Sequence, residues 1–545
     1  MRDALSKKIV DIEPSGIRKF FDIVSEMPDA ISLGVGEPDF DTPYRVREEG
    51  IYSLEKGRTF YTSNAGLKEL RDEISRYIAR KYNLNYSAED EIMVTVGGSE
   101  AIDVALRCMV DPGDEVLIPQ PCYVSYVPCA VMADAKPVAI ELKAENEFKL
   151  TKEELIASIT DKTKILILAY PNNPTGAIMT KEELAELVPV IIDNDLYVIS
   201  DEIYSELTYG SRHCSIASFP GMKERTVVIN GFSKAFAMTG WRLGYACAPK
   251  NIMTQMIKLH QFAIMCAPTN SQFAAVEAMR NCDDEVGKMV EAYDQRRRFL
   301  LNAFKEMGIE CFEPYGAFYV FPSIKKFGMT SDEFANRLLF EQKLAVVPGT
   351  AFGASGEGFV RISYAYSVEK LKAGLERIEN FIKNLSEKNK MTGINVDYIN
   401  PFLMAATGII KDICQIEMKI GKPYVKETAF ADDSVIIMIG ITGEMRGQVM
   451  IVLSYTKALE IASKMMMGMP VEKLDEMSIS AISELGNMIM GNAATIFSTK
   501  GILIDITPPT VCRGNLTIAQ SFAQNICVPL SGGDITIELD VAVKA

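Results

Sequence analysis

Lys234 is the residue of this chain with the clearest chemical setting. It lies in the segment NGFSKAFAMTGWRLGY, close in sequence to the apolar residues Phe232, Phe236 and Met238. A lone lysine is usually a solvated surface charge. An apolar setting, however, lowers the pKa of an ammonium group, and a lysine held as the free amine can form an imine with an aldehyde. Eight residues later, Arg242 offers a forked cation that suits a phosphate, so the segment indicates an amine nucleophile near an anion site.

Two further segments place polar side chains next to predicted strands. SDEIYSEL supplies Asp201 and Tyr204, and PNNPTG supplies Asn173 directly after the apolar run KILILAY. Taken alone, these are ordinary turn, capping and core residues. Beside an amine nucleophile, Asp201 suits the nitrogen of a pyridine ring, and Tyr204 and Asn173 suit its phenolate oxygen. This is the set of partners that pyridoxal 5'-phosphate (PLP) requires.

The residues Gly97, Gly98 and Ser99 end a predicted strand and open a predicted helix. A tight strand–helix turn explains them, with Ser99 near the helix cap. The alternative is a phosphate held by backbone N–H groups at the helix N-terminus and by the Ser99 hydroxyl. Tyr123, in PQPCYVSY, suits stacking on a pyridine ring, and ordinary core packing explains it equally well.

The composition of the chain excludes several classes of function. A formal net charge of −15 argues against a nucleic-acid partner. No apolar run approaches the roughly 18 residues of a membrane helix, and the charged start MRDALSKKIVDIEPSG is unlike a secretory signal. Eleven cysteines without a C-x-x-C pair favour free thiols, so we expect a cytoplasmic protein. With only two histidines, His213 and His260, no metal site is expected, and acid–base chemistry must come from other side chains or a cofactor.

Short apolar runs alternate with amphipathic stretches from about residue 90 to 250. The predicted strands are EIMVTVGG, EVLIPQ, KILILAY, LYVIS and TVVINGF. Near-continuous Val, Ile and Leu strands separated by helices predict a parallel sheet covered on both faces. Ligands of such sheets lie beyond the carboxyl ends of the strands, where the glycines and polar residues of this chain accumulate.

The order and wording of these segments resemble a known family. The likeness runs from about residue 5 to 385 and is carried by LGVGEPDFDTP, YTSNAGLKELR, VTVGGSEA, PNNPTG, SDEIYSEL, SKAFAMTGWRLGY, PYGAFYVFP and GFVRISYA. They are similar to the motifs of class I aminotransferases of PLP fold type I. The resemblance implies an α/β fold with a mostly parallel sheet, helices on both of its faces and a small α/β domain. It also implies PLP bound covalently to Lys234.

The same resemblance implies roles for residues that the chemistry alone does not single out. Arg361, in GFVRISYA, is expected to bind the substrate α-carboxylate, with Asn173 and the backbone of Gly36 beside the substrate. Tyr61 is expected to reach the cofactor phosphate of a neighbouring subunit, which implies a homodimer with shared sites.

One position departs from the family pattern. Many relatives have a serine three residues before the lysine, where this chain has Gly231. We therefore expect the phosphate to depend more on Arg242, Ser99 and Ser233.

The resemblance implies transamination of an L-amino acid with a 2-oxo acid, and 2-oxoglutarate is the expected acceptor. The segments are most similar to those of the aspartate, aromatic and N-acetyl-diaminopimelate aminotransferases. Some aspartate-preferring relatives have a lysine where Ser99 stands, so the amino donor stays open. A PLP-dependent carbon–sulfur lyase is the alternative activity for this part of the chain.

A length of 545 residues predicts more than one domain. The polar, lysine-rich stretch KNLSEKNKMTGINVDY separates two apolar patterns and reads as a linker. The expected boundaries are 1–385 for the aminotransferase (large PLP-binding domain about 40–285, small domain from 1–39 and 286–385), 386–396 for the linker and 397–545 for a second domain.

The second domain has its own pattern, with VIIMIGITG and GQVMIVLSY as strands and a helix over SISAISELGNMIMGNAATIFS. Ser480, Glu484 and Asn487 fall four and three residues apart, which places them on one helix face. A polar stripe on a surface helix explains them. The flanking Gly486 and Gly491 cost helix stability and instead indicate close approach of another surface.

This domain, from DYINPF through ELGNMIMGN, resembles the CheX branch of the CheC/CheX/FliY chemotaxis phosphatases, an α+β fold. An acid followed three residues later by asparagine is the hallmark of that family, and Glu484 and Asn487 match it. The resemblance implies that the pair acts on the phospho-aspartate of a response regulator, with Asn487 positioning the attacking water. A catalytically silent module that dimerises or recruits a partner is the alternative.

Overall fold

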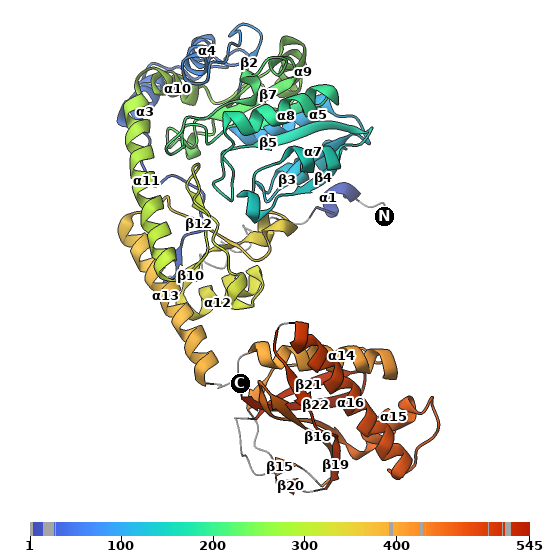
Figure 1. Ribbon diagram of the computed structural model, residues 1–545. Helices are drawn as coiled ribbons and strands as arrows, with labels where there is room; N and C mark the ends of the chain where they lie inside the picture. The colour runs from blue at the N-terminus through green and yellow to red at the C-terminus, as the bar shows by residue number, and fades with distance from the viewer. Residues whose placement is uncertain are drawn as a thin grey trace. The chain divides into compact units, whose positions relative to one another are not determined.

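The computed structural model describes residues 4–12, 14, 27, 29–391, 396–425, 429–430, 432–499, 501–514, 516–517 and 525–544. The chain divides into two compact units, Met1–Phe381 and Ile382–Ala545 (Figure 1). No helix within the described residues is both long and apolar enough to cross a membrane.

A seven-stranded sheet in the order β2-β8-β7-β6-β5-β3-β4 forms the centre of the first unit. Its strands are β2 (Ile92–Thr95), β3 (Glu115–Gln120), β4 (Lys136–Glu141), β5 (Thr163–Ala169), β6 (Tyr197–Asp201), β7 (Thr226–Gly231) and β8 (Gly244–Cys247). The five strands from β7 to β4 are parallel. Strand β8 runs antiparallel to both of its neighbours, β2 and β7, so the sheet is mostly rather than wholly parallel.

Helices cover both faces of this sheet, as the apolar strands predicted. On one face, α5 (Gly98–Met109), α6 (Tyr126–Met132) and α9 (Lys250–Ala263) pack on side chains such as Ile118 and Ile167. On the other face, α7 (Lys152–Ser158) and α8 (Lys181–Asp193) pack on alternate residues of the same strands. Helix α8 begins with a capping box, in which Thr180 and Glu183 satisfy each other's backbone N–H groups directly after the PNNPTG turn.

A smaller α/β layer follows helix α11 (Asp283–Glu306). Its three-stranded antiparallel sheet has the order β11-β12-β9, with β9 (Tyr319–Val320), β11 (Val347–Pro348) and β12 (Val360–Ser363). Strand β1 (Ile31–Ser32) returns from the start of the chain to pair with β10 (Leu344–Ala345). Helices α12 (Ser331–Gln342) and α13 (Val368–Met391) belong to the same part of the chain.

Helix α13 continues to Met391, so the first residues of the stretch expected to be a linker are helical. The lysines, glutamate and leucine of this stretch favour helix, which explains why its polarity did not end the helix. The remaining linker residues 392–395 lie outside the described part of the chain, as do most residues of the segment 1–28.

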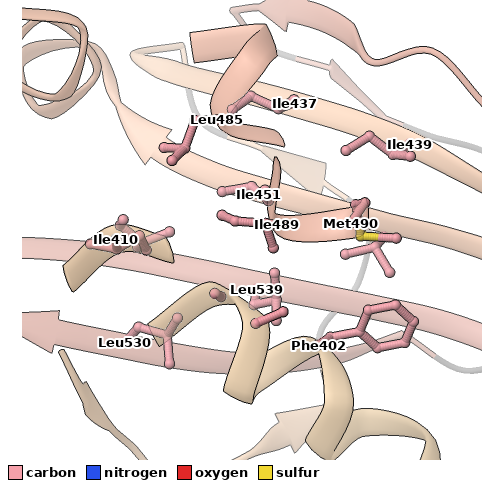
Figure 2. Close-up of a cluster of buried hydrophobic side chains, with 14 of the residues drawn as sticks. Phe402, Ile410, Ile437, Ile439, Ile451, Leu485, Ile489, Met490, Leu530 and Leu539 are labelled. Atoms are coloured by element: carbon pink, nitrogen blue, oxygen red, sulfur yellow. The ribbon is translucent and has the colours of Figure 1, made fainter. Parts of the chain in front are cut away.

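The second unit packs three helices on one face of an eight-stranded sheet with the main order β13-β21-β22-β17-β16-β18. Its long strands are β16 (Ser434–Gly443), β17 (Arg446–Ser454), β21 (Ile526–Gly532) and β22 (Ile535–Lys544), and its helices are α14 (Val396–Cys414), α15 (Tyr455–Met465) and α16 (Glu476–Thr499). Figure 2 shows its core, in which Ile410 of α14 and Ile489 of α16 face Ile451 of β17 and Leu539 of β22. This unit therefore has a hydrophobic core of its own.

Candidate active site

The carboxyl ends of β2, β3, β5, β6 and β7 meet at one edge of the large sheet and border a cavity of about 410 Å³. Parallel strands bring residues far apart in sequence to the same edge, which is why the predicted residues converge there. The predicted residues that line the cavity are Gly36, Gly98, Ser99, Tyr123, Asn173, Asp201, Tyr204, Ser233, Lys234, Arg242 and Arg361.

Lys234 follows β7 and points its amine into this cavity. Nζ donates a 2.6 Å hydrogen bond to the Gly36 carbonyl and lies over the rings of Tyr204 and Phe318, at 5.6 and 5.5 Å. Burial lowers the pKa of Lys234 to about 8, and the neighbouring Arg361 guanidinium acts in the same direction. The amine is therefore available in its free form much closer to neutral pH than that of an exposed lysine.

Asp201 ends β6 and is buried at the base of the cavity. One carboxylate oxygen accepts a 2.7 Å hydrogen bond from Tyr126 Oη, and the other accepts from the backbone N–H of Ile203. Burial raises the pKa of Asp201, and the Tyr126 hydrogen bond opposes that rise. A cationic ring nitrogen beside this buried carboxylate would offset the cost of burying its charge.

Two tyrosines share a hydrogen bond on another wall of the cavity. Tyr204 Oη lies 2.8 Å from Tyr319 Oη, and both side chains are buried. Gly36 faces this pair so closely that a Cβ at that position would overlap Tyr319 Oη. Neither Tyr126 nor Tyr319 was predicted as a site residue, although the motifs that contain them, PQPCYVSY and PYGAFYVFP, were recognised.

Arg361 of β12 brings a buried cation to the cavity. Nη1 donates a 2.8 Å hydrogen bond to Asn173 Oδ1, and Nη2 donates to the Gly34 carbonyl. The guanidinium also stacks on the rings of Tyr319 and Phe352, at 4.5 and 4.8 Å. These contacts hold its plane in one orientation, as bidentate recognition of a carboxylate requires.

An anion cradle lies at the start of α5. Gly97 precedes the helix with φ of +80°, and a Cβ there would come within 2.8 Å of Arg242 Nη2. The guanidinium of Arg242 therefore lies beside the start of α5, and Ser99 of the same helix lines the cavity with it. Backbone N–H groups and an arginine fork in one place suit a phosphate.

The structure gives a reason for the unusual Gly231. A Cβ at this position would come within 3.0 Å of the Gly244 Cα and 3.1 Å of the Leu243 carbonyl oxygen. The close approach of β7 and β8 thus leaves little room for a serine. Ser233, which is buried and lines the cavity, is the serine nearest to Lys234 in sequence.

Tyr61 does not line the cavity of its own chain, and 81% of its surface is exposed. Phe60 beside it is equally exposed, and Phe262 at the end of α9 is 84% exposed. Large aromatic side chains exposed to this degree are candidates for a contact with another protein surface.

In the second unit, α16 presents the predicted polar pair on its outer side. Asn487 Nδ2 donates a 3.2 Å hydrogen bond to Glu484 Oε2, and Ser480 is exposed on the preceding turn. The two flanking glycines differ in their surroundings. A Cβ on Gly486 would come within 2.8 Å of Ile437 in the sheet beneath, whereas a Cβ on Gly491 would meet nothing within 4 Å.

The cavity of the first unit fits a flat molecule with three distinct groups. Lys234 suits an aldehyde, the buried Asp201 suits a pyridine nitrogen, and the α5 cradle with Arg242 suits a phosphate. PLP carries all three groups.

Proteins similar in sequence and in structure to this chain are aminotransferases, a class of enzyme that fits a PLP site. Residues 28–378 match the family "Aminotransferase class I and II". The chain is 51% identical over 382 residues to the putative aminotransferase YugH of Bacillus subtilis, covering 70% of this chain and 99% of that protein. It is 46% identical over 385 residues to an aspartate aminotransferase of Pyrococcus abyssi, covering 70% and 98%. A solved aromatic aminotransferase of Pyrococcus horikoshii superposes with a TM-score of 0.65 at 44% identity, covering 67% and 99%.

The chain therefore belongs to the class I and II aminotransferase family. It is a PLP-dependent enzyme of fold type I, as the sequence motifs predicted. Residues 435–531 match "Chemotaxis phosphatase CheX", so the second unit carries a CheX domain.

Proposed function

We propose that the aminotransferase transfers the amino group of an L-amino acid to 2-oxoglutarate, with residues 1–385 as the catalytic part and 397–545 as the second domain. The observation that carries the proposal is the Lys234 amine, with a pKa lowered to about 8, in one cavity with Asp201 and Arg361. PLP, when bound, supplies a conjugated ring that accepts the electron pair left on the substrate Cα.

Each residue then has a task. The Lys234 amine holds the cofactor between turnovers. It also moves the proton at the substrate Cα, because the released amine stays next to that carbon. Arg361 binds the α-carboxylate, supported by Asn173, and the Gly36 backbone borders the substrate. The hydrogen bond from Arg361 to Asn173 Oδ1 supports this division, because it leaves the Asn173 amide N–H groups free to face the cofactor phenolate.

The cofactor residues divide by the part of PLP that they contact. Asp201 keeps the ring nitrogen protonated, Tyr204 donates to the phenolate oxygen and Tyr123 stacks on the ring. The phosphate is bound by four groups, which are the Gly98 backbone, the hydroxyls of Ser99 and Ser233, and Arg242.

A panel of amino donors tests this proposal. Purified protein is incubated with 2-oxoglutarate and single amino acids, including aspartate and the aromatic ones, and glutamate formation is measured. Lys234→Ala should lose both the lysine-bound cofactor absorption and turnover. If that variant retained both, the assignment of Lys234 would be wrong.

A carbon–sulfur lyase on the same fold gives a different result. Cystathionine without added 2-oxo acid would then release pyruvate, whereas an aminotransferase needs the acceptor for each turnover. No contact among the described residues favours the lyase, so transamination stands as the proposal.

We also propose a homodimer in which Tyr61 contacts the cofactor phosphate of the partner subunit. The high exposure of Tyr61 and of its neighbour Phe60 supports a subunit interface at this segment. Light scattering after size-exclusion chromatography should give twice the chain mass. Tyr61→Phe should weaken PLP binding and leave that mass unchanged.

For the second domain we propose phosphatase action on the phospho-aspartate of a response regulator. The support is the pair of the exposed Glu484 and the half-buried Asn487, held together by its own hydrogen bond on α16. Asn487 positions the attacking water, and Glu484 orients the substrate. Wild type should speed the dephosphorylation of a phosphorylated response regulator, and Asn487→Ala should not. Equal rates would favour the alternative, a silent interaction module.

A further inference from the structure

A carboxylate that the proposed mechanism does not use belongs to the same helix turn as the phosphate cradle. Glu100 follows Gly98 and Ser99 in the first turn of α5. Its Oε2 accepts a 2.5 Å hydrogen bond from the backbone N–H of Val96, the residue before the cradle glycines. This hydrogen bond links the two ends of the turn between β2 and α5. The position of Glu100 therefore helps to orient the backbone N–H groups of the cradle.

The other oxygen of this carboxylate is bound by a buried histidine. His260, on α9, is 0% exposed, and its Nδ1 lies 2.5 Å from Glu100 Oε1. Nε2 is also buried, and it has no hydrogen-bond partner among the described residues. A carboxylate oxygen accepts hydrogen bonds, so Nδ1 is the ring nitrogen that donates in this contact. His260 thus acts as a fixed donor to Glu100.

The histidine also lies at the end of an element that holds the segment carrying Tyr61. The His260 carbonyl accepts from the N–H groups of Ile264 and Met265, which directly follow α9. The Met265 carbonyl in turn accepts a 2.9 Å hydrogen bond from Asn64 Nδ2. A few residues on, Thr269 Oγ1 donates to the Phe60 carbonyl at 2.7 Å. The His260 side chain thus contacts Glu100 beside the cradle, and its backbone carbonyl binds the residues after α9, one of which holds Asn64.

We propose that Glu100 and His260 are a positioning pair for the two elements that hold the cofactor phosphate. The pair fixes the position of the cradle in its own subunit through the hydrogen bond to Val96. The contact with Glu100 also fixes the end of α9 at His260, and through it the position of the segment that carries Tyr61. The inference rests on the proposed function, because Tyr61 contacts a phosphate only if the protein is a PLP-dependent homodimer with shared sites. Neither Glu100 nor His260 lines the cavity, so both would act as positioning residues.

The first test replaces the histidine and measures PLP binding by the apoprotein. His260→Leu keeps much of the volume but removes the donor, and we expect the PLP dissociation constant to rise about tenfold. At saturating PLP, kcat and the KM for the amino acid should stay near wild type, because the groups around the substrate are unchanged. His260→Asn places an amide N–H where Nδ1 was, so it should restore most of the affinity. Unchanged affinity in His260→Leu would overturn the proposal.

A matched control separates positioning from general loss of stability. Arg297 is equally buried, binds Asp294 and Glu313, and does not line the cavity. Arg297→Leu should lower the unfolding temperature without changing the PLP dissociation constant. Equal weakening of PLP binding in Arg297→Leu and His260→Leu would show that His260 has only a structural role. Loss of PLP binding in wild type would instead contradict the proposed function itself.

Mixed dimers test the second half of the proposal. A subunit with Lys234→Ala is paired with a competent subunit, so that only one site captures PLP covalently. His260→Leu in the competent subunit should weaken that site about tenfold. The same change in the Lys234→Ala subunit should weaken it about threefold, through the segment of Tyr61. A change in the first arrangement alone would overturn the part of the proposal that concerns Tyr61.

Discussion

The Lys234 amine should react with PLP at a much lower pH than an ordinary lysine does. Burial and Arg361 lower its pKa from 10.5 to about 8. Only the free amine attacks an aldehyde, so the capture rate should rise with pH through about 8 and level off above it. Stopped-flow absorbance on the apoprotein measures this rate.

The cause of this low pKa can be tested separately. Arg361→Gln removes a cation that disfavours the ammonium form, so the midpoint of the capture rate should move to higher pH. A wild-type midpoint near 10.5, unchanged in Arg361→Gln, would contradict both the burial of the amine and its coupling to the guanidinium.

Arg361 should not be replaceable by lysine. The guanidinium plane is held by Asn173 and Gly34 and by stacking on Tyr319, and an ammonium group makes neither the paired nor the stacked contacts. We expect Arg361→Lys to lower kcat/KM for the amino donor roughly a hundredfold, mainly through KM. Steady-state kinetics at saturating PLP measure this. An unchanged KM would place the α-carboxylate elsewhere.

Most of the cavity wall was predictable from the sequence because its residues follow strands. The missed residues have partners that are distant in sequence. Tyr126 lies 75 positions from Asp201, and Tyr319 lies 115 positions from Tyr204, so no local pattern connects either pair. Their hydroxyls become site groups only when the sheet edge and β9 come together.

At the scale of elements, five strands of the large sheet were predicted, and β4 and β8 were not. Strand β4 (KPVAIE) has only one buried residue, so it lacks the near-continuous apolar run of the central strands. The sequence of β8, GYAC, is short and begins with glycine, so no apolar run marks it. The antiparallel direction of β8 also depends on the path of the segment 232–243 that joins it to β7, which hydrophobic periodicity does not encode. The close packing of Gly231 on Gly244 is the consequence at the site.

The two glycines of α16 should respond oppositely to the same substitution. Gly486→Ala forces a methyl group to within 2.8 Å of Ile437, so the second unit should lose about 1–3 kcal/mol of stability. Gly491→Ala points into open space and should gain up to about 1 kcal/mol from helix propensity. Thermal unfolding followed by circular dichroism measures both.

This pair of variants also tests the sequence-based view of the glycines, which grouped them as sites of close approach. The structure supports that view for Gly486, where the sheet of the same unit is the approaching surface, and not for Gly491. Equal destabilisation by both alanines would mean that another surface covers Gly491 in solution.

At the scale of the whole molecule, each unit has its own hydrophobic core, so ligand binding should stabilise them separately. PLP binds only the folded aminotransferase unit, and at a hundredfold excess over its dissociation constant it should add about 2.7 kcal/mol to that unit alone. The single tryptophan, Trp241, lies in the first unit, so its fluorescence reports the unfolding of that unit without contribution from the second.

Adding PLP should therefore raise the unfolding temperature seen by Trp241 fluorescence, while the transition that Gly486→Ala lowers in circular dichroism should stay where it is. Lys234→Ala should reduce the fluorescence shift, because the covalent part of cofactor binding is lost. If PLP moved both transitions together, the two units would unfold as one cooperative body despite their separate cores. Transamination and response-regulator dephosphorylation would then be expected to influence each other, and Asn487→Ala would be the variant with which to look for that effect on turnover.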